Sequence, residues 1–204
     1  MGNLRYFADS SVISLLLSNI LVVILALVQS WDVTTVLWVY WMQSIIIGFF
    51  QMLRILSLKK FSTDKFTINN QPASPTTQTK IFTAFFFAFH YGFFHFIYAI
   101  FLSNFFTNLP FDFTYLLTGG LIFFLNHLFS FYQDKVIDQQ KVQNIGQIML
   151  FPYTRIIPMH LIIIFGALLG PPTLIIFLLF KTLVDILMHT IKHQFNYSVQ
   201  VDQN

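Results

Sequence analysis

The residues best suited to chemistry lie at regular spacing in the last apolar segment of the chain. Lys181, Asp185, His189 and His193 follow one another at intervals of four residues. Because a helix advances about 100° per residue, each interval of four drifts by only ~40°, and the four side chains form one slowly turning stripe. Ionisable side chains cost roughly 2.5 to 3.5 kcal/mol each at the centre of a bilayer, so they normally face a protein interior or a cavity. The stripe therefore indicates a buried polar site in a membrane bundle.

Imidazole and carboxylate groups are the usual ligands of transition metals such as zinc and iron, and a helix can present two of them four residues apart. The pairs Asp185/His189 and His189/His193 have this spacing. Other histidines lie at similar depths in the cytoplasmic halves of neighbouring segments. We predict a zinc or iron site bound by a subset of five residues: His90, His127, His160, Asp185 and His189. A bound metal with one open position could activate water, which suggests a membrane hydrolase or oxidoreductase acting on lipid.

Other chemistries remain open or are excluded by composition. The chain has no cysteine, and all eight acidic residues are aspartate, which excludes thiolate sites, disulfides and di-iron sites built on Glu-x-x-His pairs. A b-type haem between two facing histidines stays possible, with His90 or His127 on one side and His160 or His189 on the other. Three further residues suit the carboxylate or phosphate group of a lipid or small-molecule substrate: Tyr153, Arg155 and Lys181.

Two alternatives need no metal. In a proton-coupled carrier, Asp185, the histidines and Lys181 would form a relay, and Pro158 would act as a hinge. In a purely structural membrane partner, the same residues would only pack. For His95 a packing role is predicted, and His193 can be a residue of the interface.

The elements that position these residues follow from composition. Of 204 residues, 56% are hydrophobic and only 9% are charged, which predicts an integral membrane protein. We expect an all-α, polytopic membrane bundle that forms a single domain over residues 1–204. Six apolar stretches are long enough to cross a bilayer: 11–29, 34–56, 81–103, 113–132, 148–169 and 172–193.

The distribution of basic residues predicts the orientation in the membrane. The loop between the second and third spans carries Arg54, Lys59, Lys60, Lys65 and Lys80, and the loop between the fourth and fifth carries Lys135 and Lys141. The alternate loops carry none. By the positive-inside rule these two loops and both termini lie in the cytoplasm, so a multi-pass protein of the cytoplasmic membrane is expected. The lipid bilayer is the expected partner, nucleic acid is not, and a homo-oligomer is compatible with the sequence.

Helical spacing also predicts which side chains face inward. Ser11, Ser14 and Ser18 form a small-residue face, and Gly119-Gly120 marks a close helix contact. Inward polar faces are predicted for two sets of residues: Trp41, Ser44, Gly48 and Gln51, and Tyr91, His95 and Tyr98, with His90 on another side of its helix. Residues 59–80 are expected to be a flexible connector and residues 133–147 a soluble loop or short surface helix.

Proline in the fifth span predicts a kink. Pro158 lacks an amide hydrogen, so one backbone carbonyl of this segment must find another donor inside the protein.

Four strings carry a resemblance to a known family: WVYWMQSIIIGFF, HYGFFHFIYAIF, PYTRIIPMHL and KTLVDILMHTIKH. They resemble a family of small prokaryotic integral membrane proteins described as a domain of unknown function. The resemblance covers most of the chain from the second span onward. It implies a six-span bacterial or archaeal membrane protein and supplies no activity.

Overall fold

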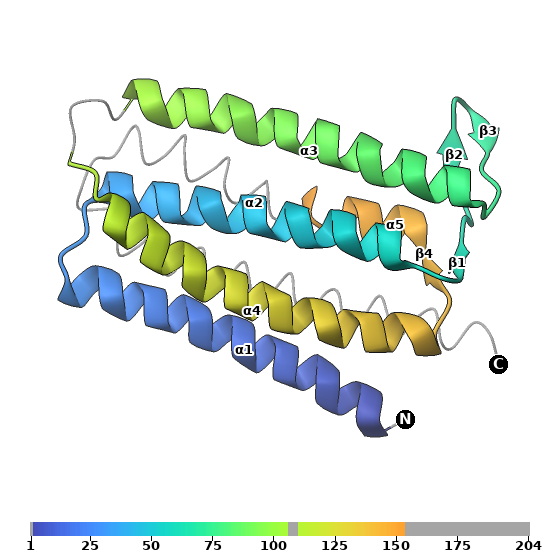
Figure 1. Ribbon diagram of the computed structural model, residues 1–204, viewed down its shortest axis with the longest axis horizontal. Helices are drawn as coiled ribbons and strands as arrows, with labels where there is room; N and C mark the ends of the chain where they lie inside the picture. The colour runs from blue at the N-terminus through green and yellow to red at the C-terminus, as the bar shows by residue number, and fades with distance from the viewer. Residues whose placement is uncertain (1, 106–109, 154–204) are drawn as a thin grey trace.

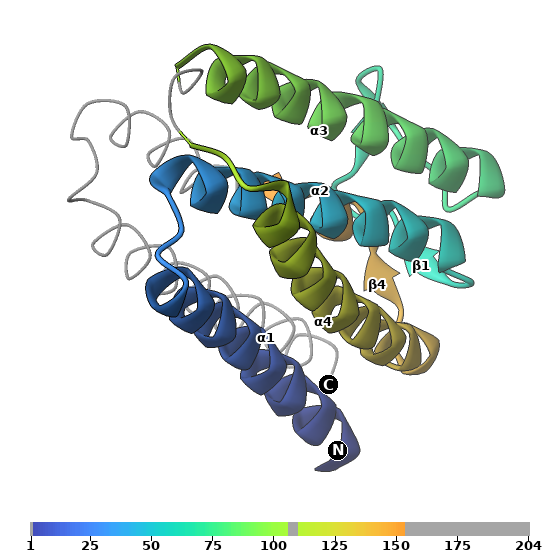
Figure 2. The ribbon, with the colours of Figure 1, turned by 60° about the vertical axis from the view of Figure 1, so that its left-hand side comes forward.

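The computed structural model describes residues 2–105 and 110–153. Four long helices form the body of this part: α1 (Gly2–Val28), α2 (Val33–Ser57), α3 (Thr77–Phe105) and α4 (Phe113–Gln140). Each runs antiparallel to the one before it, and they pack in the spatial order α3, α2, α4, α1 (Figure 1). A turned view shows the same order (Figure 2). The short helix α5 (Ile145–Leu150) packs on α2 and α3.

The expected helical class is therefore confirmed for this part of the chain. Within the described residues, three helices are long and apolar enough to cross a membrane, over Thr34–Ser57, Thr77–Asn104 and Phe113–Gln140. Helix α1 begins at Gly2 rather than near residue 11, and α4 continues eight residues past the expected end at 132. The fifth apolar stretch is not one continuous helix at its start, because α5 ends at Leu150 and a turn follows at Phe151 and Pro152.

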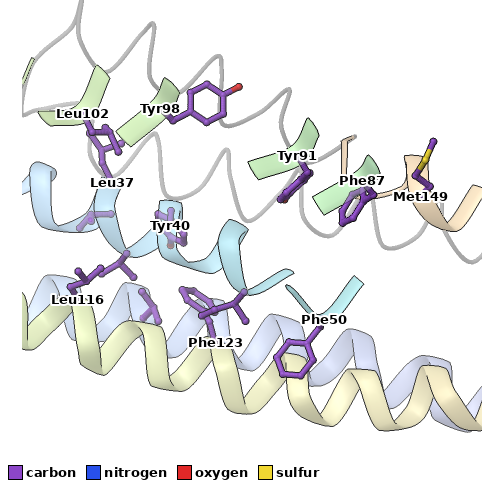
Figure 3. Packing of buried hydrophobic residues seen from close by; sticks show 14 of the residues in the cluster. Leu37, Tyr40, Phe50, Phe87, Tyr91, Tyr98, Leu102, Leu116, Phe123 and Met149 are labelled. Carbon is purple, nitrogen blue, oxygen red and sulfur yellow. The ribbon is translucent and has the colours of Figure 1, made fainter. Parts of the chain in front are cut away.

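Helix α2 supplies the centre of the core. Leu37 and Tyr40 are almost fully buried, and Tyr40 lies 5.9 Å from Phe123 of α4, ring centre to ring centre. The close view shows side chains of α3 and α4 packed on those of α2 (Figure 3). The outward face of α3 is apolar and open, with Phe89 79% exposed. An apolar outer face around a packed interior is what a bundle in hydrocarbon presents to lipid.

Glycine permits the closest helix contacts. A Cβ atom at Gly119 would lie 2.6 Å from Cγ1 of Val39, and one at Gly48 would lie 2.6 Å from Cε1 of Tyr91. Both helices beside α2 thus approach it through a position where any larger residue would collide. The predicted close contact at Gly119-Gly120 is confirmed.

Aromatic rings gather at the end of the bundle where α1 meets α2 and α3 meets α4. Trp31 stacks on Tyr115 at 5.1 Å, and Trp38 contacts Phe111 at 6.2 Å. Asp112 caps α4 by accepting hydrogen bonds from the amides of Thr114 and Tyr115. Such a ring of tryptophan and tyrosine is typical of a membrane–water interface.

The opposite end is folded by contacts between two loops, so the prediction of a flexible connector over residues 59–80 is wrong. Strands β2 (Thr67–Ile68) and β3 (Gln71–Pro72) form a hairpin whose turn residues, Asn69 and Asn70, both have positive φ. Asparagine tolerates this backbone conformation better than most residues. Strand β1 (Phe61–Ser62) pairs in parallel with β4 (Gln143–Asn144), which joins two loops distant in sequence.

Candidate functional site at the junction of α2, α3 and α5

A hydrogen bond between His90 and Tyr153 joins α3 to the segment after α5. Nδ1 of His90 lies 2.8 Å from the hydroxyl of Tyr153, and these residues are 63 positions apart in the chain. The imidazole ring stacks on Phe86 and meets Phe94 edge-on. Its side chain is exposed at this point of the described structure. The bond orients the ring, and among the described residues no hydrogen bond involves its other nitrogen, Nε2.

His95 lies on a different side of α3 and has a packing geometry. It is 1% exposed, its ring stacks on Tyr91 at 4.3 Å, and its Nδ1 lies 2.8 Å from the Tyr91 carbonyl oxygen. Because a carbonyl only accepts, Nδ1 of His95 carries the hydrogen. Tyr98 meets the same ring edge-on. The predicted separation of His90 from the shared face of Tyr91, His95 and Tyr98 is confirmed.

The predicted polar face of α2 lies against this cluster. The indole nitrogen of Trp41 donates to the His95 carbonyl at 2.8 Å, and the Tyr91 hydroxyl donates to the Ser44 carbonyl at 3.1 Å. Gly48 makes room for the Tyr91 ring. These contacts position α3, and with it His90, along α2.

Helix α5 ends at Leu150, and a turn at Phe151 and Pro152 precedes Tyr153. Pro152 has no amide hydrogen and cannot donate to the carbonyl of Ile148, its partner in a regular helix. The side-chain amide of Gln51 donates to that carbonyl instead. The sequence predicted a freed carbonyl at Pro158, which lies outside the described residues; in the described part the same effect occurs at Pro152. The turn brings the Tyr153 ring to within 5.8 Å of Phe87.

A buried charge cluster lies next to this junction. Arg54 donates two hydrogen bonds of 2.8 Å to the carboxylate of Asp138, and a third contact of 3.0 Å reaches Asp134. The side chains of Arg54 and Asp138 are only 7% and 6% exposed. The sequence alone identifies Arg54 only as a topology signal and predicts a soluble loop or short surface helix for both aspartates. One sequence signal for this cluster is the spacing of four between the two aspartates, which places both of them on one face of a helix.

His127 lies on α4, away from His90. It is 9% exposed, and α4 packs on α2 and α1. The preceding residue, Asn126, accepts a hydrogen bond of 2.6 Å from the Ser14 hydroxyl, so the small-residue face of α1 packs as predicted at Ser14. Since α2 lies between α3 and α4, His90 and His127 sit on helices that α2 separates (Figure 2).

Several predicted site residues lie outside the described part of the chain: His160, Asp185, His189, His193, Arg155 and Lys181. Within residues 2–105 and 110–153, no three potential ligands form a group that could hold a metal ion. The structure thus places one predicted metal ligand, His90, beside one predicted substrate residue, Tyr153.

The fold and this junction define a class: a helical protein with apolar helices long enough to cross a membrane and a polar centre between them. The chain belongs to a family of unknown function (DUF6498), whose model matches residues 1–200. No curated protein and no solved structure matches the chain.

Proposed function

We propose that this protein spans the cytoplasmic membrane six times with both termini in the cytoplasm. The charge distribution at the two ends of the bundle supports this orientation. The end with the β strands carries Lys59, Lys60 and Lys65, whereas Asp32 and Asp112 precede α2 and α4 at the opposite end, near the aromatic rings. Basic residues concentrate in cytoplasmic loops and tryptophan concentrates at interfaces, so the strand end faces the cytoplasm.

Within this bundle, the proposed function is transition-metal chemistry on a membrane lipid, centred on His90. The observation that carries it is the hydrogen bond between Nδ1 of His90 and Tyr153. Metal-binding histidines are usually held by a hydrogen bond from the nitrogen that does not bind the metal. If Nδ1 donates to the tyrosine oxygen, Nε2 presents its lone pair to an ion.

The remaining ligands are proposed from the last third of the chain. His160, Asp185 and His189 supply the imidazole and carboxylate groups that zinc or iron prefers. Arg155 and Lys181 lie in the same third of the chain, and their positive charges suit a phosphate head group of the substrate. His127 is the weakest member of the set, because α2 separates its helix from α3.

Metal quantification tests the proposal. Protein purified without chelator should contain about one zinc or iron per chain, His90→Ala should lose most of it, and His127→Asn should keep it. The absorption spectrum of the same sample reports a haem directly. Absence of stoichiometric metal in the wild type, or unchanged content in His90→Ala, would contradict the metal site.

One observation favours a second candidate, a proton-coupled carrier. Helices broken inside the membrane, with freed carbonyls, are typical of transporter binding sites, and α5 ends in such a break at Pro152. The His90–Tyr153 pair could exchange a proton there. Protein in liposomes should then move protons or a solute in response to a pH gradient, and indifference to the gradient would reject this candidate.

A further inference from the structure

Exposed lysines gather at the strand end of the bundle, immediately after α2. Lys59, Lys60 and Lys65 are exposed, and we refer to these three residues as the basic surface. Lys80, at the start of α3, donates a hydrogen bond of 2.9 Å to the carbonyl of Leu58, so it holds the two ends of this loop together. The basic surface is thus a folded feature and not a loose tail.

The loop contacts keep the basic surface in place. The Asn144 side chain donates to the Asp64 carbonyl at 2.9 Å, directly beside Lys65. The ring of Phe66 lies so close to Gly146 that a Cβ atom there would be 2.8 Å from Cδ2 of Phe66. Together with the pairing of β1 and β4, these contacts hold the lysines at the ends of the long helices.

Two carboxylates near this end bind an arginine and not the lysines of the basic surface. Asp134 and Asp138 both bind Arg54. Among the side chains that the structure describes, this leaves Asp64 as the nearby carboxylate outside the Arg54 cluster. Within the described residues, no ion pair involves Lys59, Lys60 or Lys65, so the charge of the basic surface can attract an anion.

We propose that the basic surface binds the phosphate head groups of anionic phospholipids in the cytoplasmic leaflet. The proposal depends on the membrane orientation proposed above and not on the metal site. The lysines follow an apolar helix that is long enough to cross a membrane, and anionic head groups lie at the membrane surface. Lysine near such a surface contributes enough attraction for about a fivefold gain in affinity, so three together give about 100-fold.

Lipid binding to the full-length protein in neutral detergent tests this, measured by native mass spectrometry. Phosphatidylglycerol should bind more tightly than phosphatidylcholine. The triple variant Lys59→Gln, Lys60→Gln, Lys65→Gln should weaken phosphatidylglycerol binding about 100-fold and leave phosphatidylcholine unchanged. The matched control replaces three exposed neutral residues between β3 and the first turn of α3: Gln71→Ala, Ser74→Ala and Gln78→Ala. This control should bind like the wild type.

Each other outcome overturns the proposal. Equal affinity for the two lipids would show that head-group charge is not recognised. Phosphatidylglycerol binding that survives the triple variant would place the lipid elsewhere. Soluble glycerol phosphate binding as tightly as the lipid would make the ligand a free phosphate. If the triple variant does not fold, Lys60→Gln and Lys65→Gln alone should each cost about fivefold, and no loss in either would equally reject the surface.

Discussion

The side chain of Gln51 supplies the hydrogen bond that Pro152 cannot give to the carbonyl of Ile148. Ile148 is only 7% exposed, so its carbonyl needs a donor from the protein. Gln51 belongs to α2 and Ile148 to α5, so one bond both satisfies the interrupted helix and fixes the position of Tyr153.

Gln51→Leu should therefore lower the free energy of unfolding by about 1 to 3 kcal/mol, because it leaves a buried acceptor without a partner. In a Pro152→Ala background the amide of residue 152 can serve Ile148, and the same substitution should cost less. Denaturation in detergent measures both differences. Gln147→Leu, at an exposed position of α5, is the control and should stay within about 0.5 kcal/mol. Equal cost of Gln51→Leu in both backgrounds would contradict this explanation.

Arg54→Gln should destabilise the protein more strongly, by about 3 to 5 kcal/mol, because it leaves the buried carboxylate of Asp138 and the partly buried carboxylate of Asp134 without a counter-charge. Adding Asp134→Asn and Asp138→Asn to the same protein should recover much of the loss. The unfolding midpoint in detergent reports the effect. A triple variant no more stable than Arg54→Gln alone would show that charge neutralisation is not what Arg54 provides.

Local spacing predicted the contacts that lie within one helical face. Trp41, Ser44 and Gly48 recur at intervals of three and four, and all three contact α3 as expected. The same reasoning separated His90 from His95. Helical periodicity is a property of neighbouring residues, so such faces can be inferred without knowing the partner helix.

Contacts between distant loops could not be predicted in this way. Strands β1 and β4 are two residues each, too short for any alternation of side chains to mark them. The polar residues 133–140 resemble a soluble loop or a short surface helix, yet they continue α4, and Arg54 binds the aspartates on its inner face. Only the packing of α2 against α4 reveals that partner.

Tyr153→Phe should weaken metal binding about 10- to 100-fold if His90 is a ligand, because the imidazole loses the bond that orients it. The fold should change little, since the ring and its contacts with Phe87 and Tyr91 remain. Competition with a chromophoric chelator measures the affinity. Unchanged affinity in Tyr153→Phe together with lost binding in His90→Ala would mean that His90 binds metal without help from the tyrosine.

The orientation can be tested with single cysteines, because the chain has none of its own. Gln71→Cys at the strand end and Asp32→Cys at the aromatic end are both exposed positions. In intact cells, a membrane-impermeant maleimide should label the cysteine at position 32 and not the one at 71, and lysis should expose both. Labelling of position 71 in intact cells would invert the proposed topology.

Gly48→Ala should lower the free energy of unfolding by about 1 to 3 kcal/mol, because its methyl group would collide with the Tyr91 ring. That ring cannot move aside easily, since its hydroxyl is bonded to Ser44 and its face is stacked on His95. Gly92→Ala is the matched control on α3, because a Cβ atom there would meet no neighbouring element within 4 Å among the described residues. Because alanine is a better helix former than glycine, this control should keep the wild-type stability or gain up to ~1 kcal/mol. Equal effects of the two substitutions in a detergent unfolding assay would show that α2 and α3 do not meet at Gly48.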